Sequence, residues 1–309
     1  MLLSVVYRLH PAVDAHLPAT LGQAIHGAFF NLVEQADPAL ARRLHSPSGS
    51  RLPTKFTTSP LQGPSSAQDG RISLSKDQAY WLRFTSLDRE LSQLLLNLPA
   101  ERIGCLNLLG VPLEVEQVAT EPGQHPWAAH TDFAALYDHW LVKCRRPPRR
   151  IGLRFYSPTT FRHDKLNLPF PLPRLIFLTL ADKWNAFSPV HLGAEINEAI
   201  DDFLEPTRYE LRTRVMRFPH SYESGFVGRC EYRLHRATQE GDLLMRIINL
   251  LTDFAFYAGV GAKTTMGMGQ ARRILIVQRS GSEPRRDGRS PKPTRAPSAT
   301  VDSGAEIVI

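Results

Sequence analysis

Two Gly-x-Gly pairs follow the last long apolar segment of the chain, with a lysine and two threonines between them. The residues are Gly259, Gly261, Lys263, Gly267 and Gly269, with Arg272 and Arg273 just beyond. Glycine lets a backbone approach a ligand closely and exposes N–H groups to an anion. The pattern lacks the Gly-x-x-x-x-Gly-Lys-Ser/Thr of a P-loop, and its glycines follow a helix, whereas those of a dinucleotide-binding loop follow a strand. A flexible turn is the simpler alternative, but the two pairs with a lysine between them favour binding of a phosphate backbone.

Two histidines near the N-terminus have the chemistry for proton transfer, since the unperturbed pKa of histidine is ~6.5. His45 ends a short expected helix and opens a loop, where it can reach a bound strand, although an exposed histidine stabilised by a helix end is the alternative. His26 lies within an expected helix and is equally well explained by packing beside the core. Lys55 and Arg51 are candidate cations beside a phosphate, or else solvated loop charges. The sequence leaves the choice of histidine open.

Arginines occupy alternate positions, and so one face, of each of two neighbouring expected strands. They are Arg208, Arg212 and Arg214 on the first strand, and Arg229 and Arg233 on the second. The opposite parity of the second strand is apolar, so a hairpin with one basic face is expected. Such a face would follow a phosphate backbone, and a merely solvated sheet face is the alternative. The excess of 37 Lys and Arg over 30 Asp and Glu also suits a polyanionic partner.

The composition excludes several classes of protein. With 309 residues, 42% hydrophobic and 22% charged, the chain reads as an ordinary globular protein of two modest domains, without a membrane-crossing run. The N-terminus lacks the features of a signal peptide, so a cytoplasmic location is expected. The three cysteines are expected to be buried or half-buried thiols. No metal and no cofactor are expected, because H-E-x-x-H, clustered carboxylates and Cys pairs are missing.

Residues 1–122 are expected to form a β-α-β-β-α-β unit. Strands are expected at 2–9, 54–60, 71–85 and 111–119, and helices at about 20–35 and from Leu87. Thr20 and Gln23 have the spacing of a capping box for the first helix. Asp37 and Pro38 are expected to cap and begin a short helix that ends near His45.

Residues 150–279 repeat the same order after a bridging helix at 131–143 within the linker 123–149. Strands are expected at 150–156, 209–218, 226–236 and 268–278, and helices from Pro173, near 194–204 and at 239–257, the last capped by Thr238. The fold class is therefore α+β, with tandem ferredoxin-like domains and a C-terminal Gly-rich loop. Residues 280–309 are rich in Ser, Pro, Gly and Arg and are expected to be a disordered tail.

A Gly-rich loop placed after the last helix of a second ferredoxin-like unit resembles the signature of CRISPR-associated endoribonucleases that cut precursor CRISPR RNA within its repeats. Further segments are similar to that family: 153–161, 171–177 and Trp184-Asn185 in the second unit, and Arg43-Leu-His45 with 55–61 in the first. The resemblance covers residues 1 to about 278.

The resemblance implies a metal-independent cut in which a 2′-OH attacks the adjacent phosphate, giving a 2′,3′-cyclic phosphate and a 5′-OH. It places His45 at the position of the family's catalytic histidine, while some branches use a first-helix histidine such as His26. The tyrosine that many members carry on the first helix is absent, because Phe29 and Phe30 occupy its neighbourhood. Either His26 acts as the base in place of that tyrosine, or His45 works without a partner base.

The implied partners are CRISPR repeat RNA and an interference complex, and a homodimer is left open. A non-catalytic RNA-binding subunit of the same fold is a second hypothesis, which the missing tyrosine keeps open. A third is a regulatory ferredoxin-like protein whose glycines hold a metabolite phosphate. Cleavage assays in EDTA and the salt dependence of RNA binding distinguish the three.

Overall fold

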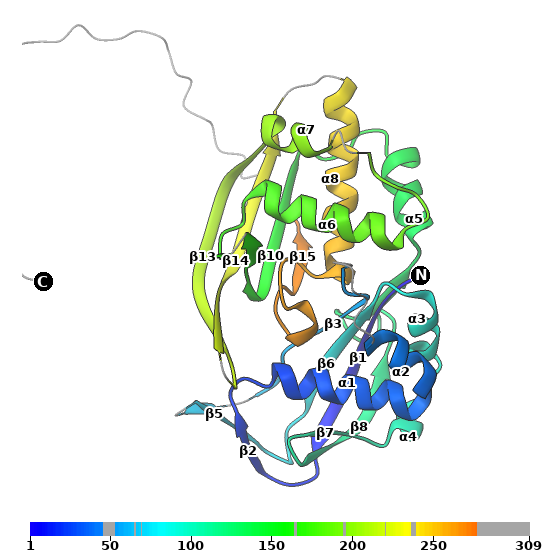
Figure 1. The fold of residues 1–309 in the computed structure, drawn as a ribbon, viewed down its shortest axis with the longest axis vertical. Helices are drawn as coiled ribbons and strands as arrows, with labels where there is room; N and C mark the ends of the chain where they lie inside the picture. Colours follow the sequence, from blue (N-terminus) through cyan, green and yellow to red (C-terminus); the bar gives the residue numbers. More distant parts are fainter. Residues whose placement is uncertain are drawn as a thin grey trace, which may run out of the picture. The chain divides into compact units, whose positions relative to one another are not determined.

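The first half of the chain forms an antiparallel sheet in the order β3-β6-β1-β8-β7, with β9 paired to β1 (Figure 1). Its strands are β1 (Leu2–Pro11), β3 (Phe56–Thr58), β6 (Tyr80–Ser86), β7 (Cys105–Leu108), β8 (Val111–Ala119) and β9 (Ala129–Thr131). The helices are α1 (Gly22–Ala36), α2 (Pro38–His45), α3 (Arg89–Leu96) and α4 (Ala100–Ile103). A small sheet joins β2 (Ala15–Pro18), β5 (Arg71–Leu74) and β4 (Ser66–Gln68) in the order β2-β5-β4.

The second half repeats this plan with the antiparallel order β13-β14-β10-β15. Its strands are β10 (Arg150–Thr159), β13 (Leu204–Phe218), β14 (Ser221–Leu234) and β15 (Ala271–Ile274), with a small β11 (Phe161–His163) and β12 (Leu166–Leu168) pair. The helices are α6 (Pro173–Phe187), α7 (Ile196–Phe203) and α8 (Gln239–Ala258). In each half the second, third, first and fourth strands of a β-α-β-β-α-β unit lie side by side in that order. This is the ferredoxin-like arrangement, so the predicted tandem fold is confirmed.

In each sheet, the apolar side chains on one face pack under the helices of the same half. In the first half, Val5 and Tyr7 of β1 pack with Ile25 and Phe29 of α1. In the second half, Leu153 of β10 and the apolar parity of β14 share one cluster with α6 and α8. The other face of the first sheet is also partly covered, because Ser4 and Val6 of β1 are buried and Arg83 of β6 reaches Phe256 of α8.

The computed structural model describes residues 1–45, 53–64, 66–68, 70–163, 166–193, 196–219, 221–235 and 239–276. Residues 1–276 form one compact unit. The expected cap Thr238 and the expected tail at 280–309 lie outside the described residues. The domain limits at 122, 149 and 279 stay predictions.

Several elements differ from expectation in detail. The strand expected at 71–85 is split into β5 and β6 by a turn. The bridging helix is α5 (Phe133–Tyr137) continued by a π-helix (Asp138–Lys143). The capping box is wrong, because the buried Leu21 occupies the cap position of α1 and no side chain caps that helix. The last strand is shorter because 267–270 belong to the Gly-rich loop, and Cys105 is exposed because it faces outward from edge strand β7.

Candidate active site and RNA-binding surface

The rings of His26 and His45 both contact the ring of Phe30. Phe30 lies one turn after His26 on α1, and the two ring centroids are 5.0 Å apart. The centroid of His45, at the end of α2, lies 4.9 Å from that of Phe30, and both contacts are edge-to-face. His45 is exposed and His26 is half-buried. The structure therefore brings both sequence-predicted histidines to one place.

His45 is placed there by the cap of α2. The Asp37 carboxylate accepts hydrogen bonds from the backbone N–H groups of Ala39 at 3.0 Å and Leu40 at 2.9 Å. Pro38 begins the helix, where its missing N–H and fixed φ cost nothing. The predicted cap and first residue of this helix are confirmed, and the helix ends at His45.

His26 is held by a backbone carbonyl of the Gly-rich loop. Its Nδ1 lies 3.0 Å from the carbonyl oxygen of Thr265, 239 residues away in sequence. A carbonyl only accepts, so Nδ1 carries the proton and Nε2 of the neutral ring is left as an acceptor. Burial and the charge of His45 lower the pKa of His26, and the bond to Thr265 acts in the opposite direction without reversing the shift. The ring is therefore neutral at pH 7.

Lys55 is an ion-paired residue. Its Nζ lies 3.1 Å from Asp88 Oδ2, and the other oxygen of Asp88 caps α3 by accepting from Leu91 N at 3.0 Å. Burial alone would raise the pKa of Asp88, but these bonds and the Lys55 charge together hold the pKa below its usual value. Lys55 precedes Phe56, whose ring contacts both His26 and Phe30. Arg51, the other candidate cation, lies outside the described residues.

The four glycines of the Gly-rich loop are required by the chain's own packing. Gly259, Gly261, Gly267 and Gly269 have φ of 63°, 79°, 91° and 71°. A Cβ on Gly261 would lie 2.3 Å from the Thr160 carbonyl oxygen, and one on Gly269 would lie 2.1 Å from that of Val260. The sequence predicted close approach to a phosphate, but the backbone that these glycines approach is the protein's own. Contact of the loop with RNA stays a prediction.

Lys263 is also engaged within the protein. It has a left-handed φ of 53°, and its Nζ lies 2.8 Å from Glu223 of β14 and 4.1 Å from the centre of the Phe218 ring. Its side chain is 28% exposed. Lys263 therefore links the Gly-rich loop to the β13-β14 hairpin, and an RNA phosphate would have to compete with Glu223 for it.

The arginines of the hairpin divide into paired and unpaired groups. Arg229 pairs with Glu210, Arg233 with Glu205 at 2.8 Å, and Arg208 with Glu210 at 3.5 Å. Arg212 and Arg214 are exposed and make no ion pair with any described residue. The apolar parity of β14, including Phe226, Cys230 and Tyr232, is buried, which confirms the predicted two-faced hairpin.

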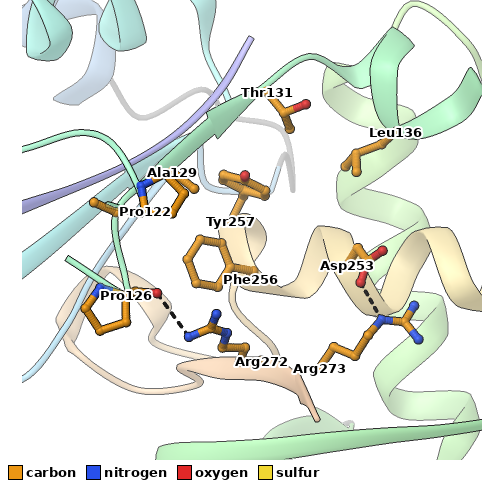
Figure 2. Close-up of a pocket in the computed structure, with 11 residues that line it drawn as sticks. Pro122, Pro126, Ala129, Thr131, Leu136, Asp253, Phe256, Tyr257, Arg272 and Arg273 are labelled. Atoms are coloured by element: carbon orange, nitrogen blue, oxygen red, sulfur yellow. Dashed lines mark hydrogen bonds and ion pairs between the residues drawn. The ribbon is translucent and has the colours of Figure 1, made fainter. Parts of the chain in front are cut away.

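Arg272 lies on a separate cavity of about 440 Å³ shown in Figure 2. Its Nη1 donates to the Pro126 carbonyl at 3.0 Å, while Arg273 pairs with Asp253 of α8. Of the predicted catalytic residues that the structure describes, His26, His45 and Lys55 do not line this cavity. Arg272 is thus placed apart from the two histidines.

Two buried cations near the Gly-rich loop were missed by sequence reasoning. Arg83 of β6 donates to Ser4 Oγ at 2.7 Å and to Gln270 Oε1 at 2.5 Å. Lys183 of α6 reaches the end of α8. A charged residue in a strand or helix normally marks its solvated face, so the sequence carried no signal for either contact.

Among the described residues, no group of three or more His, Cys, Asp or Glu side chains is placed to hold a metal ion. A helix able to cross a membrane is not found in the described part of the chain.

Two family models match the chain. The CRISPR Cas6 N-terminal domain matches residues 1–138, and the CRISPR-associated endoribonuclease Cas6 matches 153–271. A CRISPR-associated endoribonuclease Cas6 of Streptococcus thermophilus is 31% identical over 123 residues, which are 38% of this chain and 48% of that protein. The match thus spans about half the length of this curated relative.

Solved Cas6 structures are similar over nearly the whole described chain. A Cas6 product complex superposes with a TM-score of 0.71 at 28% identity, covering 89% of this chain and 100% of that one. Thermus thermophilus Cas6 gives a TM-score of 0.66 at 28% identity, covering 89% and 98%. A Cas6-related protein of Pyrococcus furiosus, at 14% identity and a TM-score of 0.57, shares the fold. The two domain models, the repeated ferredoxin-like topology and these likenesses agree, and the chain belongs to the Cas6 family of CRISPR-associated endoribonucleases.

Proposed function

We propose that this chain cuts precursor CRISPR RNA within its repeats, without a metal ion, by attack of a 2′-OH on the adjacent phosphate. The observation that carries the proposal is the placement of His26 and His45 against one aromatic ring at the junction of α1, α2 and the Gly-rich loop. Two imidazoles that contact the same aromatic ring can supply the proton acceptor and the proton donor that such a transfer needs.

The reaction requires three things of the site. A base takes the proton of the 2′-OH, an acid protonates the departing 5′ oxygen, and a cation stabilises the charge on the phosphorane. The histidines serve the first two. Lys55 supplies the cation. It directly precedes Phe56, whose ring contacts His26. An RNA phosphate would have to displace Asp88, with which Lys55 is paired. The products are a 2′,3′-cyclic phosphate and a 5′-OH.

RNA is held mainly through its phosphates on the β13-β14 hairpin. Arg212 and Arg214 are exposed and pair with no carboxylate of the described residues, so a phosphate contact there would break no ion pair seen in the structure. Counterion release then makes the affinity fall steeply with salt. Association with an interference complex remains a further expectation of the proposal.

The test is a cleavage assay on transcripts of candidate CRISPR repeats, with the product ends mapped. Cutting should persist in EDTA and stop when the sugar at the cut is 2′-deoxy, although that substrate should still bind. His45→Ala should lower the rate by about 10²–10⁴-fold, the usual contribution of a positioned proton-transfer group. Cutting of the deoxy substrate would exclude 2′-OH attack.

A second candidate function is RNA binding without cleavage. Phe30, whose ring contacts both histidines, carries no hydroxyl, and Lys55 is paired with Asp88. Tight, salt-sensitive binding of repeat RNA with no cleavage by the unaltered protein would favour this function.

A further inference from the structure

The cavity of about 440 Å³ in Figure 2 is lined by strands from both halves of the chain. Residues of β9 come from the first sheet, residues of β15 come from the second, and α8 supplies further side chains. The volume lies within the ~300–1,000 Å³ that is usual for sites that bind small molecules. Because His26, His45 and Lys55 do not line the cavity, a ligand held here lies away from the proposed cut.

The cavity has an excess of positive charge. Asp253, the carboxylate in its lining, is already paired with Arg273. Arg272 lines the cavity without an ion pair to any described residue, and the guanidinium of the buried Arg83 lies over the Phe256 ring, 4.3 Å from its centre. Two arginines without a free carboxylate between them repel one another, and a bound anion would relieve that repulsion.

Arg272 has the geometry to hold a phosphate. Its Nη1 donates to the Pro126 carbonyl at 3.0 Å, which fixes the guanidinium at the wall of the cavity. The guanidinium has further N–H groups, and these make no hydrogen bond with a described residue. A planar fork of N–H donors suits the oxygens of a phosphate group.

The hydroxyl of Tyr257 is a polar group without a partner. The residue is only 8% exposed, and its hydroxyl makes no hydrogen bond with any described residue. Burial raises the pKa of Tyr257 to about 12, so the hydroxyl keeps its proton and can donate it to an acceptor. Buried polar groups are normally hydrogen-bonded, so the partner of this hydroxyl must come from whatever occupies the cavity.

Phe256 presents an aromatic ring between these two polar groups. Figure 2 shows Phe256 between Tyr257 and Arg272, and Pro122 and Leu136 add apolar lining. Nucleobases stack on aromatic side chains whatever their sequence, because every base has a π-face. A ring flanked by a guanidinium and a hydroxyl therefore matches the base, the phosphate and the polar oxygens of a nucleotide.

We propose that this cavity binds a single nucleotide, with the phosphate on Arg272, the base against the Phe256 ring and an oxygen of the sugar or base accepting from Tyr257. The nucleotide is either free in solution or part of an RNA strand, and the chemistry of recognition is the same. The cavity is separate from the residues proposed to cut RNA, so the inference goes beyond the proposed function.

Isothermal titration calorimetry with 5′-AMP and 5′-CMP tests the site. Both should bind saturably, whereas adenosine or inorganic phosphate alone should bind at least about tenfold more weakly, because each makes only part of the contacts. Arg272→Gln keeps a donor for the Pro126 carbonyl but loses the charge, and it should weaken 5′-AMP binding by roughly 10–100-fold. The matched control is Arg154→Gln. Arg154 is exposed on β10 and pairs in register with Arg272, but it does not line the cavity, so affinity should change by less than about threefold.

Tyr257→Phe separates a binding role from a structural one. The variant keeps the ring and removes only the hydroxyl that has no protein partner. Affinity for 5′-AMP should fall by about 3–10-fold, the contribution of one hydrogen bond, while the melting temperature of the free protein should not fall. A lower melting temperature with unchanged affinity would show that the hydroxyl serves only the fold and would overturn its assigned contact.

Competition with repeat RNA identifies the source of the nucleotide. If the nucleotide belongs to an RNA strand, saturating repeat RNA should block binding of 5′-AMP. If it is free, 5′-AMP should bind equally well to the RNA-loaded protein, and either result supports the site. The inference fails if neither nucleotide binds saturably, or if Arg272→Gln and Tyr257→Phe bind 5′-AMP as tightly as the unaltered protein. Such a failure leaves the proposed function standing, because the cleavage assay tests that function separately.

Discussion

Arg83 of β6 and Lys183 of α6 donate hydrogen bonds to neighbouring carbonyls at the C-terminal end of α8. Arg83 reaches Phe256 O, and Lys183 reaches Ala258 O at 2.7 Å and Gly259 O at 3.2 Å. Both side chains are buried, and neither forms an ion pair within the described residues. The last carbonyls of a helix lack intrahelical donors and carry the negative end of its dipole. One basic side chain from each half of the chain therefore fixes the point at which the Gly-rich loop begins.

The first prediction concerns Lys183. Burial lowers its pKa to about 7, and the neutral amine still has two N–H groups for its two carbonyls. Between about pH 7 and the unfolded value of ~10.4, the unfolded chain binds a proton that the folded chain lacks, so the free energy of unfolding rises with pH. The slope should approach ~1.4 kcal/mol per pH unit and should be missing in Lys183→Met. Urea unfolding at pH 7.5, 8.25 and 9 measures it, and equal slopes in both proteins would show that Lys183 titrates normally.

The second prediction separates backbone strain from close packing in the Gly-rich loop. Gly110, in the β7-β8 turn, has φ of 89° with nothing within 4 Å of an added Cβ, so Gly110→Ala should cost about 1–2 kcal/mol from conformation alone. Gly261→Ala adds a contact of 2.3 Å with Thr160 O and should lower the free energy of unfolding by more. Thermal or urea unfolding compares the two, and equal losses would mean that the loop relaxes freely.

The third prediction concerns the ion pair of Asp88 and Lys55. Asp88→Asn keeps an oxygen for the α3 cap and frees Lys55, so RNA affinity should rise by up to about fivefold, because an exposed pair contributes ~0.2–1 kcal/mol. Asp88→Ala should bind RNA as tightly as Asp88→Asn but unfold about 1 kcal/mol more easily through loss of the cap. Filter binding and urea unfolding measure these changes. Unchanged RNA affinity in Asp88→Asn would show that Lys55 does not contact the RNA.

The fourth prediction concerns the unpaired arginines of the hairpin. Alanine at both Arg212 and Arg214 should weaken binding to all RNA sequences alike and reduce the slope of log affinity against log salt by about 2, one for each phosphate contact. Arg102→Ala, which removes an exposed arginine from α4, controls for the loss of one positive charge and is compared with Arg212→Ala and Arg214→Ala taken singly. If the slope of log affinity against log salt is unchanged in the double variant, the RNA does not contact these two arginines.

The elements of the fold were predictable because they depend on local periodicity. The alternation in β14 predicted its buried face, and Asp37 with Pro38 predicted the start of α2. The error at Thr20 arose because burial of Leu21 outweighs a side-chain cap, and burial depends on the whole fold.

The candidate site was predictable only in its side chains. His26 and His45 were singled out by residue type and place, but their shared contact with Phe30 depends on how α1 packs on α2. The partner of His26 is a backbone carbonyl, which any residue at position 265 provides, so the sequence carries no mark of it. The glycines signalled close approach correctly, but their spacing does not say whether the approaching group is RNA or the protein itself.

The bond between His26 and Thr265 also has a consequence for the order of biosynthesis. The ring is made early during translation, whereas the carbonyl that orients it emerges from the ribosome only after 239 further residues have been added. An N-terminal half that folds first, as domains commonly do during synthesis, carries both imidazoles but lacks the group that orients His26. The contact between the His26 ring and the Thr265 carbonyl can therefore form only after the second half of the chain has been synthesised.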